Sequence, residues 1–185
     1  MVRLALAISW HGDSAGMVIR LASENDLEQV IGNLRSANQK LLGEGIYQWD
    51  DTYPTRELLE SDIHNKTMFV AFEHDRVIAS VSVDTKEPAV YSSISWNPET
   101  SNPLMIHRLC VTPEKQGQGV GRKMLDFTEI YGAEQGHDCA RVDVHTANVV
   151  ALATYEHRGF KRLGEVFFPR RTMPFICMEK LLLSS

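Results

Sequence analysis

Apolar residues recur along the chain in two spacings, one typical of helices and one typical of strands. Five of them are spaced as one face of a helix: Leu27, Val30, Ile31, Leu34 and Leu41. Ser23 is a good N-cap for this helix, which we expect to end near Leu42, before Gly43. A shorter helix is predicted from the Thr55 cap to Asn65, and another covers residues 148–158.

Strand patterns occupy most of the remaining chain. Apolar or alternating runs predict strands at residues 17–22, 68–72, 77–83, 106–111, 140–145, 160–167 and 175–183. Residues 90–96 are a further candidate for a short strand. His74-Asp75 provides the turn of a hairpin between the second and third of these strands. The mixture of helical and strand patterns predicts one α/β domain over residues 17–185.

The first 16 residues carry the least information. An apolar run from Leu4 to Trp10 is short and is followed by His11-Gly12-Asp13, with no persuasive cleavage site for a signal peptide. We therefore expect residues 1–16 to form a loosely ordered extension.

A glycine-rich loop separates the strand at 106–111 from a helix. Gly117, Gly119 and Gly121 occupy alternate positions, and glycine lets a backbone approach a ligand closely. From Val120 onward, apolar or aromatic residues recur on one helical face: Val120, Met124, Phe127 and Tyr131. The start of a helix offers unpaired N–H groups and a positive dipole end, so the loop predicts an anion site that suits phosphate.

Two common phosphate motifs do not match this loop. A P-loop requires Gly-Lys-Ser/Thr at the helix start, whereas Gly121 is followed by Arg122. A dinucleotide fingerprint requires a third glycine where Arg122 stands, although Asp143 lies near the expected ribose-binding acid. The dinucleotide alternative is therefore disfavoured.

Composition limits the classes of function. The 185 residues carry 19 basic and 24 acidic side chains, a net charge of −5, which gives no indication of nucleic-acid binding. No stretch approaches the roughly 20 apolar residues of a membrane span. Three cysteines, widely spaced, indicate neither a disulfide framework nor a zinc ribbon, and favour a reducing, cytoplasmic setting. His137, Cys139 and His145 lack recognised ligand spacing, so we predict no metal site.

The loop and its surroundings resemble the GCN5-related N-acetyltransferase (GNAT) family. Residues 116–121, QGQGVG, match the family's Q/R-x-x-G-x-G/A loop, which cradles the pyrophosphate of acetyl-CoA. The preceding IHRLCV and TPE, and the later segment from Asn148 to Phe160, are also similar to the family. The resemblance covers about residues 18–183. It implies a twisted mixed sheet of six or seven strands with helices on both faces.

The resemblance also implies how acetyl-CoA, the acetyl donor, would be bound. Its pyrophosphate would lie on Gln116, Gly117, Gln118, Gly119, Val120, Gly121 and Arg122. In this family the preceding strand separates from its neighbour at a bulge, and its backbone pairs with the pantetheine arm. Carried over, those backbone groups belong to Leu109 and Val111, one of whose N–H groups is the expected oxyanion partner. Asn148 would bond the cofactor arm, although a plain N-cap is the alternative.

Three residues are candidates for catalysis by proton transfer. Tyr155 matches the family's tyrosine that protonates the departing thiolate; the alternative is a core tyrosine. Asp143 alternates with Val142 and Val144, and is a candidate base or anchor for the acceptor ammonium; the alternative is a salt bridge to Arg108 or Arg141. His107 is the other candidate base, because a histidine titrates near neutrality. Many family members instead lose the proton through water.

The acceptor side is the least defined. Residues 44–55 are rich in aromatic and acidic residues, and the family uses this region to border its acceptor. Glu44, Trp49 and Tyr53 are therefore substrate-binding candidates, whereas packing of the aromatics on the sheet is the alternative. We expect N-acetylation of a small amine or a peptide amine, without nucleic-acid or membrane partners. A homodimer, or an acyl-CoA-binding regulatory module with little turnover, stays open.

Overall fold

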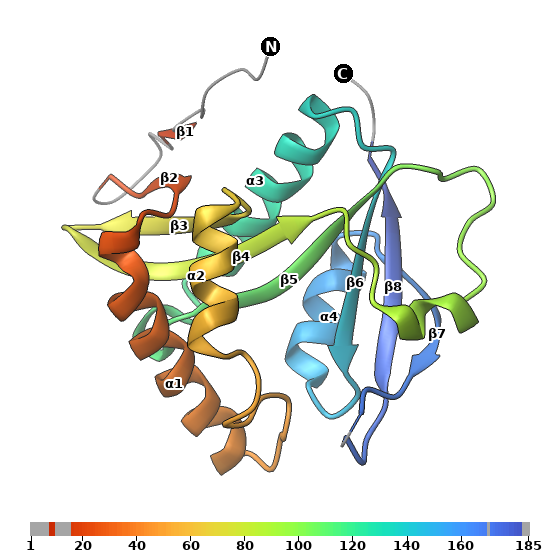
Figure 1. Ribbon diagram of the computed structural model, residues 1–185, viewed down its shortest axis with the longest axis horizontal. Coiled ribbons are helices and arrows are strands. Elements are labelled where there is room, and N and C mark those ends of the chain that lie inside the picture. Colours follow the sequence, from red (N-terminus) through yellow and green to blue (C-terminus); the bar gives the residue numbers. More distant parts are fainter. Residues whose placement is uncertain (1–7, 10–15, 170, 183–185) are drawn as a thin grey trace. The chain divides into compact units, whose positions relative to one another are not determined.

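The computed structural model describes residues 8–9, 16–169 and 171–182 (Figure 1). Most of the extension predicted for residues 1–16 lies outside this part. The chain forms two compact units that are interleaved in sequence. The first holds the described residues up to Val83 together with Arg108–Phe127. The second holds Asp84–His107 and the described residues from Thr128 onward.

The first unit contains the following elements: β1 (Ile8–Ser9), β2 (Val18–Leu21), η1 (Glu24–Asp26), α1 (Leu27–Gly43), α2 (Arg56–His64), β3 (Met68–Glu73), nearly all of β4 (Arg76–Asp84) and η3 (Pro113–Lys115). Its strands lie in the order β1-β2-β3-β4, followed by the last part of β5 (Pro103–Val111). The pairs from β1 to β4 are antiparallel. The predicted hairpin turn is confirmed, since His74 and Asp75 both have positive φ, 47° and 61°.

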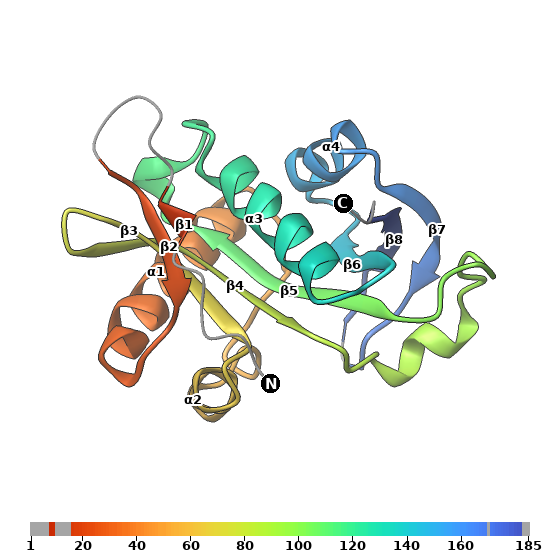
Figure 2. The same cartoon turned by 90° about the horizontal axis from the view of Figure 1, so that it is seen from above.

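Two layers of helix cover the strands of the first unit. α1 and α2 bury apolar side chains against one face, in a core that includes Val30, Leu59 and Val70. The first part of α3 (Val120–Glu134) lies on the other face, where Phe127 meets Phe69 edge to face at 4.8 Å (Figure 2). Successive side chains of a strand point to opposite faces, so Phe69 and Val70 serve the two layers.

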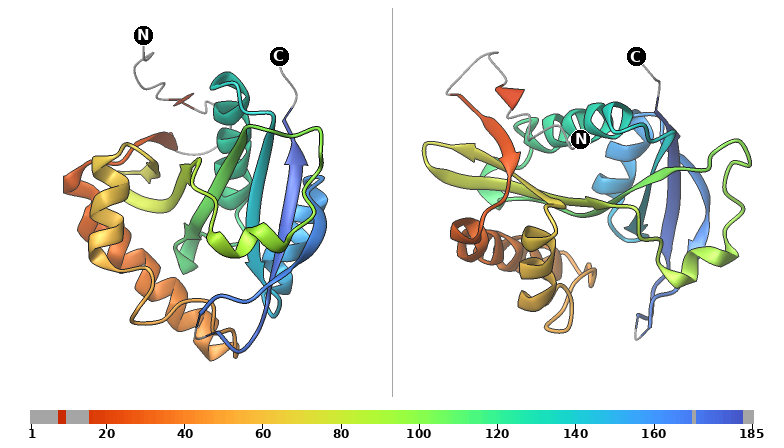
Figure 3. Two further views of the ribbon diagram at one scale, coloured as in Figure 1. Left: turned by 45° about the vertical axis from the view of Figure 1, so that its right-hand side comes forward. Right: turned by 45° about the horizontal axis from the view of Figure 1, so that its top comes forward.

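The second unit contains η2 (Ala89–Ser93), the beginning of β5, the end of α3, β6 (Cys139–His145), α4 (Val149–His157), β7 (Lys161–Val166) and β8 (Phe175–Leu181). Its strands lie in the order β5-β6-β8-β7. β5 and β6 are parallel, and the other two pairs are antiparallel. α4 covers one face of β6 and β8, and the segment that follows β4 covers the other (Figure 3).

The structure corrects one predicted strand. Residues 90–96 do not form a strand; η2 occupies Ala89–Ser93 instead. The hydroxyls of Ser92 and Ser93 donate to the carbonyls of Ala89 and Val90, at 2.9 and 3.0 Å. Such local bonds offer the backbone an alternative to a strand ladder, which explains the turn.

The predicted fold class, a mixed α/β fold, is confirmed. The described residues contain seven strands of four or more residues, β2 to β8, in addition to the two-residue β1. They also contain four α-helices. None of the helices in this described part has the length and apolar content to cross a membrane.

Candidate active site

The loop before α3 has the shape expected of an anion cradle. Gly117 and Gly119 have φ of 74° and 80°, values in the left-handed region that favours glycine. A Cβ atom added to either would meet no other atom within 4 Å, so the backbone faces open space. Residues 116–119 form turns, and the helix begins at Val120. The N–H groups of its first turn therefore lie beside the loop.

Side chains brace this loop from both ends. Lys40 of α1 donates to Gln116 Oε1 at 2.6 Å, which places a cation beside the loop. Gln116 Nε2 in turn donates to the carbonyl of Val111 at 3.0 Å. Gln118 Nε2 donates to the carbonyl of Glu114 at 2.7 Å. The two glutamines thus fix the turn while the glycines remain accessible.

The strand before the loop is irregular at Arg108. This residue has φ of 52°, unusual for a side chain of its size, and it stands in the middle of β5. The irregularity directly precedes Leu109, one of the two residues whose backbone was predicted to pair with the pantetheine arm. Irregular strands re-aim their neighbouring backbone groups.

A buried polar cluster surrounds the Arg108 side chain, which is 7% exposed. Its guanidinium forms an ion pair with Asp62 of α2 and donates to the Tyr53 hydroxyl at 2.9 Å. Ser82 of β4 donates to the same Asp62 carboxylate at 2.7 Å. Arg108 Nε is buried without a hydrogen-bond partner. The cluster links residues 44–55, α2 and β4 to the irregular point of β5.

Tyr155 is buried in the second unit. Its ring meets Phe160 edge to face at 5.1 Å. Burial, with a further contribution from the charge of Asp143, raises the pKa of the Tyr155 phenol. The phenol therefore stays protonated at neutral pH, as a general acid requires.

Asp143 is half-buried on β6, between two buried valines. Its Oδ1 accepts a hydrogen bond from the hydroxyl of Tyr91 at 2.8 Å. The two arginines considered as alternative partners are held by other carboxylates: Arg141 by Glu179 and Glu87, and Arg108 by Asp62.

His107 has a carboxylate partner. Its Nε2 lies 3.1 Å from Oδ1 of Asp84, the last residue of β4. Both side chains are largely buried. A carboxylate that orients an imidazole is compatible with proton transfer and equally with a structural pair.

Asn148 is the N-cap of α4. Its side-chain oxygen accepts from the N–H of Ala151 at 3.1 Å, which is the capping role considered as the alternative. Because an amide also carries donors, this cap does not use up its hydrogen-bonding capacity.

The acceptor-binding candidates differ in exposure. Trp49 is 6% exposed and belongs to the core of the first unit, so its position suits packing. Tyr53 is half-buried and packs against the same core, with its hydroxyl on Arg108. Glu44 is exposed at the C-terminal end of α1.

The three cysteines lie in the interior of the described part of the chain. Cys110, Cys139 and Cys177 are buried thiols, and burial raises the pKa of each to about 12. Over the residues that the structure describes, no group of three or more histidine, cysteine or acidic residues is arranged to hold a metal ion.

The sequence model of the acetyltransferase (GNAT) family matches residues 34–160, more than half of the chain. The protein is a member of the GNAT family. The fold agrees with this. A GNAT acetyltransferase from Streptococcus agalactiae superposes with a TM-score of 0.77 at 23% identity, covering 90% of this chain and 95% of that one.

Two further GNAT-type proteins are similar to the chain. An N-acetyltransferase from Thermoplasma acidophilum, solved in complex with coenzyme A, has a TM-score of 0.68 and 22% identity, with 89% of this chain and 98% of that one covered. N-acetyltransferase family 8 member 3 of Rattus norvegicus is 29% identical over 86 residues. That match covers 44% of this chain and 38% of the rat protein.

Sequence reasoning missed several polar residues of this GNAT protein. Asp62 follows the apolar residues Leu58 and Leu59 by four and three positions. This helical spacing could have placed Asp62 on the same, inward-facing side of α2. His107-Arg108 interrupts an apolar strand with two polar residues, which was a weaker sign of irregularity. Nothing in the local pattern around Tyr91 indicated that its hydroxyl would reach Asp143.

Proposed function

We propose that this protein transfers the acetyl group of acetyl-CoA to a primary amine, by direct attack within a ternary complex. The observation that carries the proposal is the accessible loop of Gly117 and Gly119 at the start of α3. Such a loop is suited to a pyrophosphate, because backbone N–H groups and the helix dipole both favour an anion. The coenzyme A complex of the Thermoplasma relative supports the same donor class.

The donor would be held by residues from two parts of the chain. We assign its pyrophosphate to residues 116–122 and its pantetheine arm to the backbones of Leu109 and Val111, with help from Asn148. The positive φ of Arg108, 52°, supports this assignment, since it alters the direction of the backbone just before Leu109. One N–H of Leu109 or Val111 would stabilise the oxyanion that forms on the acetyl carbonyl.

Proton transfers accompany the acetyl transfer. The acceptor ammonium, with an ordinary pKa near ~10, must lose a proton before its nitrogen attacks the carbonyl carbon. Asp143 is our first candidate for taking that proton or anchoring the ammonium, and His107 is the second. The carbon–sulfur bond then breaks, and Tyr155 gives its proton to the thiolate. The nitrogen loses its second proton as it becomes an amide, and that proton restores the Tyr155 phenol. The products are the acetylated amine, coenzyme A and one proton.

The acceptor site is assigned to residues 44–55. Glu44 and its acidic neighbours Asp50 and Asp51 suit a cationic acceptor, and Tyr53 would border it. Because Trp49 is buried, it would support the acceptor site from the core and would not contact the acceptor. The buried thiols are compatible with a reducing compartment such as the cytoplasm.

The decisive experiment measures thiol release from acetyl-CoA across a panel of amines, polyamines, amino acids and peptides. We expect turnover with at least one acceptor and formation of an acetyl-amine product by mass spectrometry. Coenzyme A binding without turnover on any acceptor would support the regulatory module instead. Failure to bind coenzyme A at all would contradict both functions.

A further inference from the structure

Tyr91 lies outside the predicted site, yet it is among the most buried side chains of the second unit. It belongs to η2 and is 1% exposed. Its ring packs in an apolar cluster with Met105, Val166 and Cys177. A phenol so deeply buried is normally hydrogen-bonded, and its hydroxyl donates to Asp143.

Trp96 fixes both the ring and the backbone of Tyr91. The two rings lie 5.1 Å apart with an interplanar angle of 47°. The indole N–H of Trp96 donates to the Tyr91 carbonyl at 3.3 Å. The guanidinium of Arg141 lies 4.2 Å from the centre of the Trp96 ring, in cation–π contact. Tyr91 is therefore held at its ring and at its main chain.

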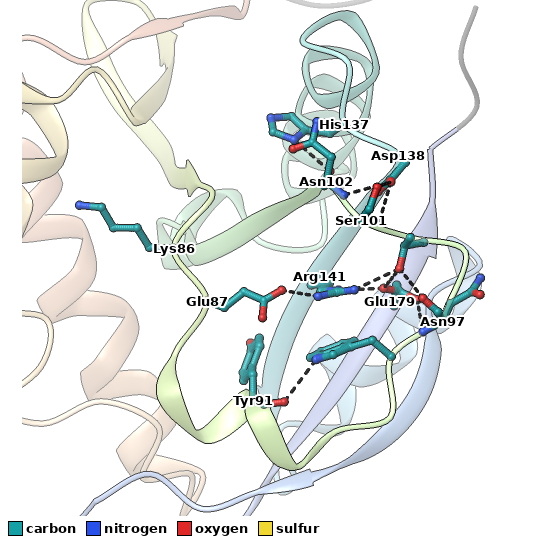
Figure 4. A network of polar contacts seen from close by, with 12 residues as sticks. Lys86, Glu87, Tyr91, Asn97, Ser101, Asn102, His137, Asp138, Arg141 and Glu179 are labelled. Atoms are coloured by element: carbon teal, nitrogen blue, oxygen red, sulfur yellow. Dashed lines mark hydrogen bonds and ion pairs between the residues drawn. The ribbon is translucent and has the colours of Figure 1, made fainter.

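Arg141 is itself anchored between two carboxylates, as Figure 4 shows for Glu87 and Glu179. The Arg141 and Glu179 side chains are 6% and 5% exposed. Glu179 also accepts from the N–H of Asn97 and the hydroxyl of Thr100, at 3.2 and 3.1 Å. A buried ion pair whose remaining hydrogen bonds are made strongly restricts local geometry.

A second carboxylate holds the end of the same segment. Asp138 accepts from the N–H groups of Ser101 and Asn102, at 2.7 and 3.0 Å (Figure 4). Residues 87–102 are thus tied to β6 and β8 by Arg141 and Glu179, and tied to the start of β6 by Asp138. The segment is a rigid support for Tyr91, although it has little regular structure.

Three ionisable side chains near Asp143 come from other elements: Tyr91 on η2, Tyr155 on α4 and Cys177 on β8. Tyr91 faces it from η2, and the charge of Asp143 raises the pKa of Tyr155 on α4 and of Cys177, its neighbour on β8. On the part of β5 that belongs to this unit, His107 is an ionisable side chain, and it pairs with Asp84. A hydroxyl that donates to a carboxylate stabilises its charged form.

We propose that Tyr91 is a positioning residue that orients the carboxylate of Asp143 and, through its hydrogen bond, favours the ionised form. The inference rests on the proposed function in one respect, the role of Asp143 toward the acceptor amine. Residues 87–102 then serve the reaction by holding the Tyr91 hydroxyl against the Asp143 carboxylate, without contacting the substrate.

The first test observes Asp143 directly and requires no turnover. In protein labelled with ¹³C at aspartate carboxyl groups, the Asp143 signal is assigned by its loss in Asp143→Asn and is titrated by NMR. Tyr91→Phe removes only the hydroxyl, and we expect it to raise the pKa of Asp143 by about one unit. Tyr131→Phe, which removes a phenol on α3, should leave this titration unchanged. An unchanged Asp143 titration in Tyr91→Phe would overturn the inference.

The second test uses the pH dependence of kcat/KM with the best acceptor. We expect the acidic limb to move to higher pH by about one unit in Tyr91→Phe, because a higher pKa delays formation of the carboxylate. A limb that vanishes in Asp143→Asn but stays in place in Tyr91→Phe would overturn the inference while leaving the proposed function intact. A protein that shows the NMR shift without turnover would refute the proposed function alone.

A second variant guards against a folding defect in Tyr91→Phe. Trp96→Phe keeps a ring beside Arg141 but removes the N–H that holds the Tyr91 carbonyl. We expect a smaller shift of the same sign in the Asp143 titration. A folded Trp96→Phe protein with an unchanged titration would contradict the holding role of the segment.

Discussion

The Tyr155 phenol is held in its neutral form by its surroundings. It is buried, and the nearby charge of Asp143 opposes its ionisation, so both effects raise its pKa. A neutral phenol can donate a proton to a thiolate but cannot serve as a base at physiological pH. The direction of the pKa shift therefore supports the acid role over a base role.

Replacement of Tyr155 by phenylalanine tests this role. We expect kcat to fall by about 10²-fold, because general acid catalysis contributes on this scale, while the Kd for coenzyme A changes by less than about twofold. Stopped assays of thiol release and calorimetric binding separate the two quantities. Tyr131→Phe is the matched control. Full activity in Tyr155→Phe would refute the acid assignment.

Arg108 presents a stability question at the same scale. Removal of one partner from a buried ion pair leaves an uncompensated charge, at a cost of about 3–5 kcal/mol. We expect Arg108→Met to lower the free energy of unfolding by about this amount, because it leaves Asp62 buried beside Ser82 alone. Denaturant unfolding measures the change.

A double variant and an exposed pair serve as controls for Arg108. Arg108→Met combined with Asp62→Asn removes both charges and should recover part of the lost stability. Arg56, which pairs with Glu28 on the surface, should give no measurable change when replaced by methionine. Equal losses in the single and double variants would show that charge is not the cause.

At the scale of elements, the loop before α3 depends on left-handed backbone. Gly119→Ala places a Cβ at φ of 80°, which costs about 1–2 kcal/mol although no neighbour obstructs it. We expect a weaker Kd for coenzyme A by about tenfold, because the loop would leave its cradle shape. Calorimetric titration provides the measurement.

Gly32→Ala is the control for this substitution. Gly32 lies inside α1 with open space at its Cβ position and without a positive φ. Alanine should stabilise the helix by about 0.5–1 kcal/mol and leave coenzyme A binding unchanged. Similar losses of affinity in both variants would argue against a role for the loop conformation.

The elements that sequence could predict are those specified by local pattern. The glycine loop, the caps at Thr55 and Asn148 and the His74-Asp75 hairpin depend on residues close together in sequence. Residues 90–96 were a candidate strand, but the hydroxyls of Ser92 and Ser93 bond to nearby carbonyls and favour the turn at Ala89–Ser93. Local pattern therefore succeeded where packing and propensity agree.

The candidate site was predictable only in part, because several of its polar contacts join distant residues. Arg108 meets Asp62 and Tyr53 across 46 and 55 residues, and Tyr91 meets Asp143 across 52. No spacing rule relates such pairs. The resemblance to GNAT proteins named Tyr155, Asp143 and Asn148, but it did not reveal which side chains support them.

At the scale of the whole molecule, one buried or partly buried carboxylate in each unit couples stability to pH. Burial by itself would raise the pKa of Asp26, but hydrogen bonds from Arg20 and Ser23 outweigh it, so the pKa is lowered. Burial by itself would also raise the pKa of Asp138. Hydrogen bonds from the N–H groups of Ser101 and Asn102 outweigh it, so this pKa is lowered as well. Both carboxylates stabilise the folded protein in their ionised forms.

Acid should therefore destabilise both units. A folded-state pKa below the unfolded value gives stability that is present above about pH 4 and is lost as pH falls through the lower folded pKa. We expect the free energy of unfolding to decline below about pH 4, and Asp26→Asn or Asp138→Asn to flatten the decline. Urea unfolding at a series of pH values measures it. An unchanged slope in both variants would exclude these carboxylates as its source.

The interleaving of the two units has a consequence for biosynthesis. A nascent chain that has emerged only as far as Val83 already contains Asp62 and Ser82, but Arg108 is still to be made. The charge destined for the interior of the first unit thus has no counter-charge until 25 further residues, beginning with Asp84, have been added. The first unit is complete only when Phe127 has been synthesised, and by then residues 84–107 of the second unit have already been made and must wait for the rest of their own unit.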